Sequence, residues 1–402
     1  MSETLTNPLV PDHVSPSRVF DFDIYGDPRL TADIQASYQS LHHDAPDIFY
    51  SPRNGGHWIV TRYDQIFEIV KDYENFSAKE MQVPRVENPP RNIPLNLDPP
   101  ENVPFRQALM PFFTPKAVAA MEPRVRQFAI DIIEGLMAKG ECEFVHDVSA
   151  QFPVSVFMDL MGMPLEKLHD FRQLADDYFK ARTAEDYHQL GGRIIGLMMG
   201  IADMRREDPQ DDLISKMVAF QINGRTIERQ ELQDMLLLLF LGGMDTVTNV
   251  TSYTYRHLAQ DPDLQARLVD DPEIIPNFVQ EGIRSFGVVN TPRMVARDCE
   301  QFGVKFKKGE MVVCMLPLGS RDDRRFENSG KFDVDREQLT HLTFSSGPHL
   351  CLGNNLARLE IKILTEEWVK QIPSFRLKPG VQHHSRPGLV MALEALPIEW
   401  GV

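Results

Sequence analysis

The stretch from about Glu228 to Leu258 restricts the fold more than any other part of the chain. Its apolar residues recur at helical spacing, and around Leu236 to Leu241 it is apolar on every side. A helix without a polar face is stable in water only where other elements cover it all round. The segment therefore predicts a long helix that crosses the protein interior, with the rest of the chain packed around it.

Helical periodicity also dominates the middle of the chain, while short β patterns lie on either side of it. Further helices are predicted over residues 116–136, 148–161, 165–179, 191–206 and 352–371. Short strands are predicted over 294–302 and 311–315, and a hairpin over 48–61, where Asn54-Gly55-Gly56 suits a tight turn. No repeat or linker divides the chain, so we expect one mainly α domain with small β-sheets over residues 1–402.

Residues 77–104 contain seven prolines and few periodic apolar positions. Proline removes a backbone donor and interrupts helices, so this stretch is predicted to be an ordered loop or lid. Loops of this kind often border binding sites.

The charge balance argues against nucleic-acid and membrane partners. Lys and Arg number 42 against 58 Asp and Glu, a net charge of -16, which repels phosphate and anionic lipid. The first thirty residues hold no apolar stretch suited to a signal peptide. The most apolar run, 235–244, is ten residues long, against the roughly 20 that span a bilayer. We therefore expect a cytoplasmic protein.

The four cysteines are scattered, and no Cys-x-x-Cys pair of the zinc or redox type is present. Three of them, Cys142, Cys299 and Cys314, are expected to pack as small apolar residues. Cys351 differs because it lies in Phe344-Ser-Ser-Gly-Pro-His-Leu-Cys-Leu-Gly353, directly before a predicted helix. Gly347 allows a sharp turn, and Gly353 lets a flat ligand approach the backbone. Amide N–H groups at a helix start lower the pKa of a thiol and hold its thiolate.

A single cysteine near a helix start is usually an inert core residue, but the five pattern positions together argue against that reading for Cys351. The segment resembles the haem-binding loop of the cytochrome P-450 family, whose thiolate is the proximal iron ligand. The resemblance covers nearly the whole chain. It implies haem b held by Cys351, with Phe344, His349 and Gly353 in the cofactor site. It also implies the family fold, a triangular helical bundle with a long central helix over the haem.

Gly242-Gly243-Met244-Asp245-Thr246 lies on the long predicted helix, where each glycine costs about 1 kcal/mol relative to alanine. A ligand lying against the backbone would offset that cost. Close helix packing would do so equally well, with Thr246 bonded to a carbonyl one turn back. The family's acid–alcohol pair implies that Asp245 and Thr246 deliver protons to bound dioxygen.

Cations suited to two haem propionates are Arg106, Arg293 and His349, since a buried dianion needs such partners. The family often has a histidine where this chain has Asn102 and Val103, so Arg106 is expected to carry more of that role.

Glu281 and Arg284, spaced i,i+3, form on their own no more than an ordinary surface pair. In the family the corresponding pair is buried and joined by an arginine of the following loop, here Arg336. The resemblance implies a structural role for all three.

Residues 242–249, 343–360 and 395–400 look closest to the camphor-hydroxylase branch, which implies a small hydrophobic substrate of the terpenoid or norisoprenoid kind. The lid, 77–110, contains no tyrosine, so a camphor-type hydrogen bond from it is absent. The expected pocket residues are Met81, Leu238, Leu241, Gly242, Val288 and Val289. Each of the apolar side chains could equally be ordinary core.

The chain has no Gly-x-Gly-x-x-Gly segment and no iron–sulfur cysteine set, so electrons must come from other proteins. The resemblance implies O₂ as oxidant, with a [2Fe-2S] ferredoxin and its NAD(P)H-dependent reductase as donors. Arg106 and Arg358 are expected to give the ferredoxin a local basic patch.

Two other functions stay open at this point. A peroxide-driven hydroxylase would bind the same haem but usually lacks the acid–alcohol pair. A non-catalytic haem sensor or carrier would need neither that pair nor an enclosed pocket. A nucleotide-linked dehydrogenase is disfavoured because the phosphate loop is missing.

Overall fold

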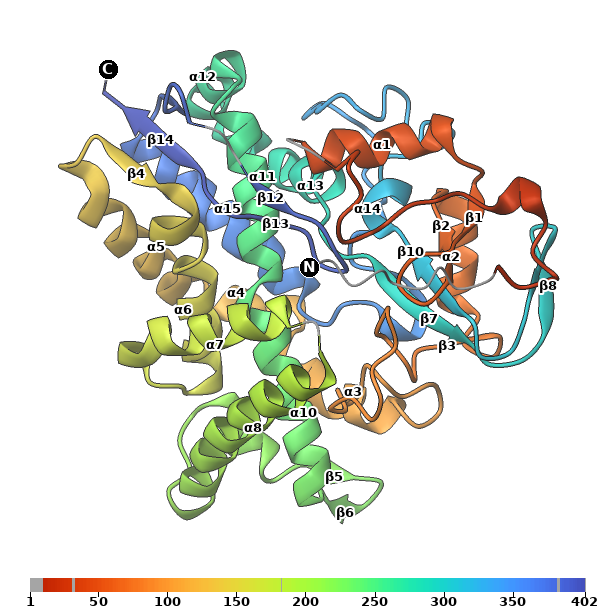
Figure 1. The fold of residues 1–402 in the computed structure, drawn as a ribbon. Helices are drawn as coiled ribbons and strands as arrows, with labels where there is room; N and C mark the ends of the chain where they lie inside the picture. Colours follow the sequence, from red (N-terminus) through yellow and green to blue (C-terminus); the bar gives the residue numbers. More distant parts are fainter. Residues whose placement is uncertain (1–9, 31–32, 182, 382–383, 402) are drawn as a thin grey trace.

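The structure is a computed structural model that describes residues 10–30, 33–181, 183–381 and 384–401. Helices form most of the molecule, and a five-stranded sheet lies on one side of it (Figure 1). The helices are α1 Ile34–Asp44, α2 Tyr63–Lys71, α3 Val103–Leu109, α4 Pro115–Ala120, α5 Glu122–Met137, α6 Phe152–Met161, α7 Leu168–Lys180, α8 Ala184–Glu207, α9 Leu213–Met217, α10 Arg229–Met244, α11 Thr246–Leu258, α12 Pro262–Asp270, α13 Ile275–Ser285, α14 Leu316–Gly319 and α15 Asn354–Gln371. The predicted mainly α class is confirmed.

The strands are short. They are β1 Ile48–Ser51, β2 His57–Val60, β3 Phe76–Ser77, β4 Glu141–Glu143, β5 Gln221–Ile222, β6 Arg225–Thr226, β7 Thr291–Val295, β8 Cys299–Gln301, β9 Val304–Phe306, β10 Met311–Cys314, β11 Phe375–Leu377, β12 Ser385–Arg386, β13 Ala392–Leu393 and β14 Pro397–Trp400. The main sheet has the order β1-β2-β10-β7-β3, in which only the β10–β2 pairing is parallel. The hairpin predicted around Asn54 is confirmed, with positive φ at Asn54, Gly55 and Gly56.

Helix starts follow ordinary capping chemistry. Asp33, Thr114, Asp212 and Asp261 each accept a backbone N–H of the first turn of α1, α4, α9 and α12. A capping box formed by Glu228 and Glu231 begins α10. These local bonds fix where the helices around the site begin.

The predicted long helix is interrupted. Helix α10 ends at Met244, and Asp245 has φ −132° and ψ −34° before α11 begins at Thr246. The two helices together cross the middle of the molecule (Figure 1). The break was not predicted, because apolar periodicity continues through it.

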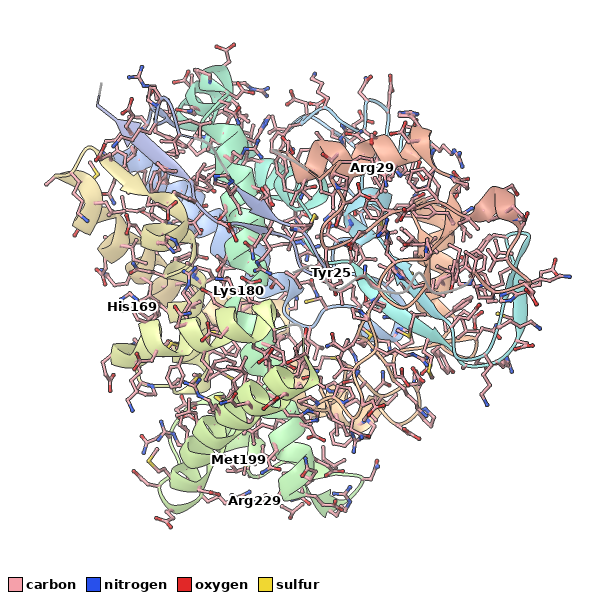
Figure 2. All side chains as sticks on the ribbon, in the orientation of Figure 1. Tyr25, Arg29, His169, Lys180, Met199 and Arg229 are labelled. Carbon is pink, nitrogen blue, oxygen red and sulfur yellow. The ribbon has the colours of Figure 1, made fainter. Side chains whose placement is uncertain are left out.

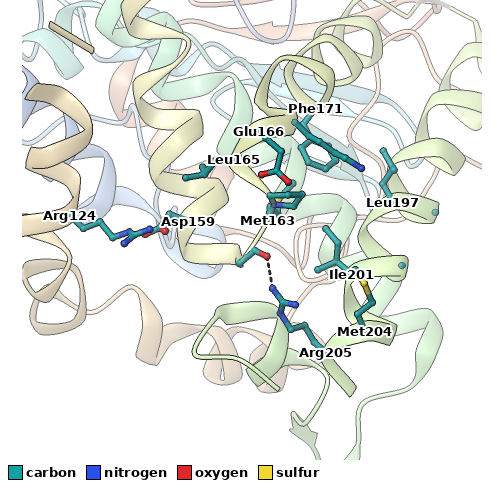
Figure 3. Close-up of a pocket in the computed structure, with 15 residues that line it drawn as sticks. Arg124, Asp159, Met163, Leu165, Glu166, Phe171, Leu197, Ile201, Met204 and Arg205 are labelled. Carbon is teal, nitrogen blue, oxygen red and sulfur yellow. Dashed lines mark hydrogen bonds and ion pairs between the residues drawn. The ribbon is translucent and has the colours of Figure 1, made fainter. Parts of the chain in front are cut away.

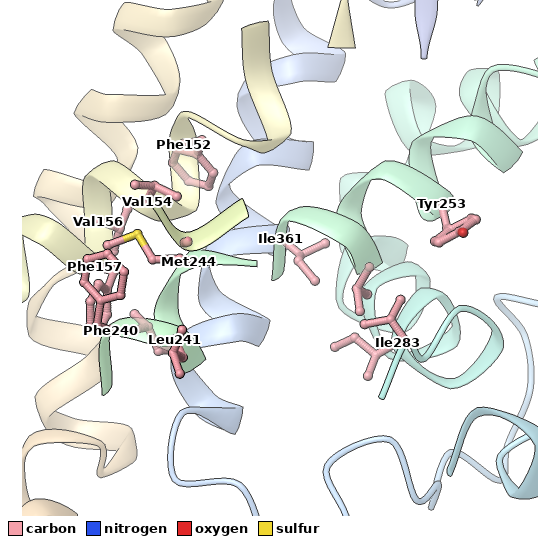
Figure 4. Packing of buried hydrophobic residues seen from close by; sticks show 14 of the residues in the cluster. Phe152, Val154, Val156, Phe157, Phe240, Leu241, Met244, Tyr253, Ile283 and Ile361 are labelled. Carbon is pink, nitrogen blue, oxygen red and sulfur yellow. The ribbon is translucent and has the colours of Figure 1, made fainter. Parts of the chain in front are cut away.

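The hydrophobic core surrounds this pair of helices. Phe157 of α6 packs against α10 beside Phe240 and Met244 (Figure 4), and Phe171 of α7 meets Phe240 edge to face at 6.1 Å. Figure 2 shows side chains filling the space between the elements, with Lys180 at the end of α7 and Arg229 at the start of α10.

By length and mean hydropathy, 1.3 over its most apolar window, the segment Arg229–Leu258 could cross a membrane, and 67% of that window is buried inside the protein. A core helix of a water-soluble protein passes the same test of length and hydropathy. The burial matches the core helix predicted from the sequence.

Candidate active site

The loop before α15 presents Cys351. Cys351 N–H bonds the Phe344 carbonyl at 3.0 Å, and Asn354 Nδ2 donates to the Cys351 carbonyl at 2.6 Å. Gly347 has φ +67°, and a Cβ there would lie 3.2 Å from the Lys71 backbone, so the position suits glycine on both counts. The Arg358 guanidinium lies 4.6 Å from the Phe344 ring centre. The loop is thus fixed on both sides of the cysteine.

Cys351 is exposed, whereas Cys142 and Cys314 are buried and Cys299 is partly buried. Even so, burial raises the pKa of the Cys351 thiol, although the Gly353 N–H and the nearby charges of Arg106 and Arg358 act in the opposite direction. The predicted lowering by a helix-start amide is present at the Gly353 N–H, but burial outweighs it in the protein alone, so the net shift of the pKa is upward.

Arg293 is a buried cation without a counter-ion. Its side chain is 1% exposed and, within the described residues, donates only to Thr291 Oγ1, the Pro292 carbonyl and Met81 Sδ. No carboxylate of the described residues forms an ion pair with Arg106 or Arg293, although the charge of Asp98 acts on Arg293. Because a buried charge favours compensation, the two arginines suit an anionic ligand.

His349 lies in the field of the same two arginines. Both of its ring nitrogens are buried without a hydrogen-bond partner, and Asp98 Oδ1 lies 4.0 Å from Nε2. Burial and then the charges of Arg293 and Arg106 lower the pKa of His349 to about 3. The imidazole is therefore neutral in the protein alone, with a ring N–H still free to donate to a ligand.

Asn102 takes the place that the family often gives to histidine. Its side chain is buried, with Nδ2 3.5 Å from the Pro348 carbonyl and Oδ1 without a partner. Arg106 Nη2 donates to the Leu350 carbonyl at 2.6 Å. The two residues therefore border the same loop as Cys351, from the side of α3.

One face of α10 is open. Leu238, Gly242 and Thr246 follow one another at i,i+4 spacing and are only partly buried or exposed, although their neighbours Leu237 and Phe240 are fully buried. A Cβ at Gly242 would meet no atom within 4 Å, whereas a Cβ at Gly243 would overlap the Phe157 ring. Close packing thus accounts for Gly243, whereas at Gly242 a side chain would have room.

Asp245 and Thr246 occupy the break. Thr246 Oγ1 donates to the Gly242 carbonyl at 3.2 Å, and Asp245 Oδ2 is buried without a hydrogen bond. Burial raises the pKa of Asp245 to about 6; Asp176 acts in the same direction, while Arg386, Asn249 and Arg172 oppose it. A carboxyl with this pKa holds and releases a proton near neutral pH.

Asn249 connects the break to the C-terminal hairpin. Its Nδ2 donates to the Asp245 carbonyl at 2.9 Å, and its Oδ1 accepts from Leu393 N–H at 3.3 Å. Neither this bridge nor the proximity of Arg386 to Asp245 was predicted. The i+4 spacing of Asn249 from Asp245 was the one signal in the sequence.

The predicted pocket residues fall in different environments. Leu241 and Val288 are buried in the core, and Val289 forms an isolated bridge with Val390. Met81 touches Arg293 through its sulfur. Only Leu238 and Gly242 lie on the open row of α10.

The trio Glu281, Arg284 and Arg336 comes together in the core. Arg284 Nε and Nη2 donate to the two Glu281 oxygens at 2.7 Å each, and both side chains are 0% exposed. Arg336 Nε donates to Glu281 Oε1 at 3.2 Å. Arg284 also donates to the Ser320 and Ser329 carbonyls, so the pair ties α13 to the loops before Cys351.

A hollow of about 820 Å³ lies elsewhere, between the loop after α6 and the outer face of α8 (Figure 3). Its walls include Met163, Phe171, Leu197, Ile201 and Met204, and none of the predicted site residues. It is separate from the Cys351 site.

Arg106 and Arg358, the residues of the expected basic patch, both lie near Cys351. Arg358 Nη1 donates to the Asn354 carbonyl and Oδ1, and Arg106 to the Leu350 carbonyl. Burial lowers the pKa of both guanidinium groups. The exposed residues near Arg106 include the apolar Val103, Met110 and Leu350.

The sequence model of cytochrome P450 matches residues 142–399. This chain belongs to the cytochrome P450 family. The crystal structure of CYP101J2 has a TM-score of 0.89 and 34% identity over 100% of both chains. That of CYP101C1 has a TM-score of 0.90 and 32% identity over 98% of this chain and 100% of the other. The probable cytochrome P450 127A1 of Sinorhizobium fredii is 30% identical over 98% of this chain and 97% of its own length.

The P450 fold and the resemblance to the camphor-hydroxylase branch are thereby confirmed. Members of this family are monooxygenases that bind haem b. The residues around Cys351 fit that group. An accessible, desolvated thiol lies near Arg106, while Arg293 supplies a buried charge without a counter-ion and His349 a buried donor without a hydrogen bond.

Proposed function

We propose that this P450 hydroxylates a small hydrophobic substrate of terpenoid or norisoprenoid size, using O₂ and electrons from a [2Fe-2S] ferredoxin. The observation that carries the proposal is the open row of Leu238, Gly242 and Thr246 in an otherwise buried helix, with the acid Asp245 beside it. Apolar side chains and a missing Cβ leave space for a compact apolar molecule next to a proton donor. We further propose that residues 1–402 act as one cytoplasmic domain.

Cys351 would hold the haem iron through its thiolate, and Arg106, Arg293 and His349 would bind the propionates. Phe344 and Gly353 would border the ring. A thiolate-bound haem supplies the activation of dioxygen. Arg106 and Arg293 form no ion pair with a carboxylate of the described residues, and this supports the assignment, because the two propionate carboxylates of haem would pair with them.

Asp245 and Thr246 would deliver protons to the reaction. Burial keeps part of the Asp245 carboxyl protonated near neutral pH, because its pKa is raised to about 6. Thr246 donates its own proton to the Gly242 carbonyl, so its oxygen can accept one from a neighbour. To relay a proton from Asp245 to the open face, the Thr246 hydroxyl would accept that proton on its oxygen and release its own, turned from the Gly242 carbonyl toward the substrate.

The ferredoxin would dock on the exposed face of α3. Val103, Arg106 and Met110 lie at i, i+3 and i+7 on this helix and its continuation, and Leu350 is bonded to Arg106. This face combines apolar side chains with one cation. Binding there should depend less on salt than docking onto a basic patch.

A panel of terpenoids and norisoprenoids tests the substrate class. Displacement of water from ferric haem shifts the Soret band, so binders are found by titration, and each is then incubated with ferredoxin, reductase and NAD(P)H. We expect hydroxylated products in proportion to NAD(P)H consumed. Binding without turnover would favour a haem sensor or carrier, and products formed only with hydrogen peroxide would favour a peroxide-driven hydroxylase.

A further inference from the structure

The lid is anchored at its base. Asp98 accepts from Ser77 Oγ at 2.5 Å and from Ala78 N–H at 2.9 Å, and the Tyr25 hydroxyl donates to the Val83 carbonyl at 2.5 Å. These bonds hold the lid to the sheet side of the molecule and to the N-terminal segment. They leave open what holds its middle, residues 84–92, over the long helix.

Asp234 lies on α10 one turn before the open row of Leu238, Gly242 and Thr246. It precedes Leu238 by four residues, so these two side chains are neighbours along the helix surface. Asp234 and Gly242 are eight residues apart on α10, about 12 Å along the axis. Unlike the members of the open row, Asp234 is closed off from solvent, being 3% exposed.

The group opposite Asp234 is Arg91 of the lid. Arg91 Nε lies 3.7 Å from Asp234 Oδ2, and the arginine side chain is 57% exposed against 4% for the carboxylate. Gln230 donates to Oδ1 at 2.8 Å, while Oδ2 has no hydrogen bond. Arg91 is the only described cation within ion-pair distance of this buried carboxylate. Because a buried charge needs compensation, moving the lid away is unfavourable until water replaces the arginine.

Two further lid contacts lie just before Arg91 in the chain. The His188 ring Nε2 lies 2.7 Å from the Asn88 carbonyl, and a Cβ at Gly191 would lie 3.0 Å from Pro90 Cγ. His188 and Gly191 belong to α8, which packs along α10. The lid therefore meets both helices within residues 88–91, and Arg91 makes the ion pair of that contact.

We propose that the Arg91–Asp234 ion pair is a clasp that closes the lid over the substrate chamber, so that substrates enter and leave only when it opens. The proposal rests on the chamber proposed above, whose wall is the open row of Leu238, Gly242 and Thr246, with Asp234 one turn before Leu238. Opening the clasp uncovers the Leu238 end of the row, which is farthest from Asp245 and Thr246. Arg91 and Asp234 are thus positioning residues that set the rates of access rather than the chemistry.

Stopped-flow binding of 4-phenylimidazole to the ferric haem protein tests this, because the ligand must pass the lid to reach the iron. Arg91→Gln and Asp234→Asn should each raise both the association and the dissociation rate by about 5- to 10-fold, with little change in Kd. The double variant should be no faster than either single variant, since one interaction has been removed. Arg91→Lys should retain most of the wild-type rates.

Arg85→Gln is the matched control, because Arg85 belongs to the same lid but pairs with Glu80 at 2.9 Å and donates to the Gly309 carbonyl, so its contacts lie on the sheet side and not on α10. It should leave the rates near wild type. Equal rates in wild type and Arg91→Gln, or equal acceleration by Arg85→Gln, would overturn the clasp.

Amide hydrogen exchange over residues 84–93 gives a readout that does not need bound haem. Arg91→Gln should accelerate exchange there by a similar factor, with or without haem. If no variant or wild-type protein takes up haem, the proposed function fails, while this exchange measurement still decides the clasp. Unchanged exchange in Arg91→Gln would contradict it.

Discussion

Thr246 Oγ1 at the start of α11 donates to the Gly242 carbonyl oxygen of α10 at 3.2 Å, which places the hydroxyl and the missing side chain one turn apart on the same open row. The adjacent Gly243 points into the core against Phe157. The two adjacent glycines thus have different surroundings: Gly242 faces open space, and Gly243 packs against the core.

The two glycines should respond differently to alanine. Gly243→Ala forces a methyl group into the Phe157 ring and should lower the free energy of unfolding by about 1 to 3 kcal/mol. Gly242→Ala meets no atom, so stability should stay constant or rise by about 1 kcal/mol, while substrate-induced Soret shifts weaken. Urea unfolding and ligand titration of both variants measure this. Equal destabilisation would show that Gly242 faces no open space.

Ionisation of the buried Asp245 carboxyl should lower the free energy of unfolding as pH rises. Its pKa in the folded protein is about 6, against the ordinary aspartate value of 3.8. The folded state therefore binds more protons between these values, and stability falls as pH rises through them. Asp245→Asn lacks this loss and should be more stable than wild type by about 2 to 3 kcal/mol above pH 6, with a smaller gain at pH 5. Its product yield per NAD(P)H should drop. Denaturant unfolding at several pH values gives the comparison, and a pH-independent difference would contradict the raised pKa.

Glu281→Gln should destabilise the protein strongly. It leaves Arg284 buried without its carboxylate, and removing one member of a buried pair costs about 3 to 5 kcal/mol. Arg267→Gln is a suitable control, because its pair with Asp335 is exposed on both sides and should contribute little to stability. Urea unfolding of both variants measures the loss of stability. Similar losses in the two would contradict the structural role of Glu281, Arg284 and Arg336.

Arg293→Met should change stability in opposite directions with and without haem. In haem-free protein it removes a buried, unpaired charge and should stabilise by about 1 to 3 kcal/mol. In the loaded protein it removes a propionate partner and should speed haem transfer to apomyoglobin. Thermal unfolding of both forms provides the test. The same sign in both forms would mean that Arg293 does not face the haem.

Much of the site could be predicted because its residues lie in local patterns. The Cys351 loop, the Gly242–Thr246 segment and the i,i+3 pair Glu281–Arg284 are each contained within a few residues. Contacts between distant segments could not be read in this way. Arg91 and Asp234 are 143 positions apart and show no shared pattern, and Asn249 meets Leu393 only after the C-terminal hairpin folds onto α11.

The break at Asp245 was missed for a related reason. Apolar periodicity continues from α10 into α11, and it reports burial rather than backbone geometry. The sequence likewise could not show that Arg106 and Arg358 donate to loop carbonyls. Side-chain direction depends on tertiary contacts.

The most direct test of Cys351 as the iron ligand is the carbon monoxide difference spectrum of the dithionite-reduced protein, compared between wild type, Cys351→Ser and the control Cys314→Ser. We predict a strongly red-shifted Soret band in wild type and Cys314→Ser, which Cys351→Ser lacks. A band at the position typical of histidine-bound haem, or a red-shifted band that survives in Cys351→Ser, would contradict the assignment.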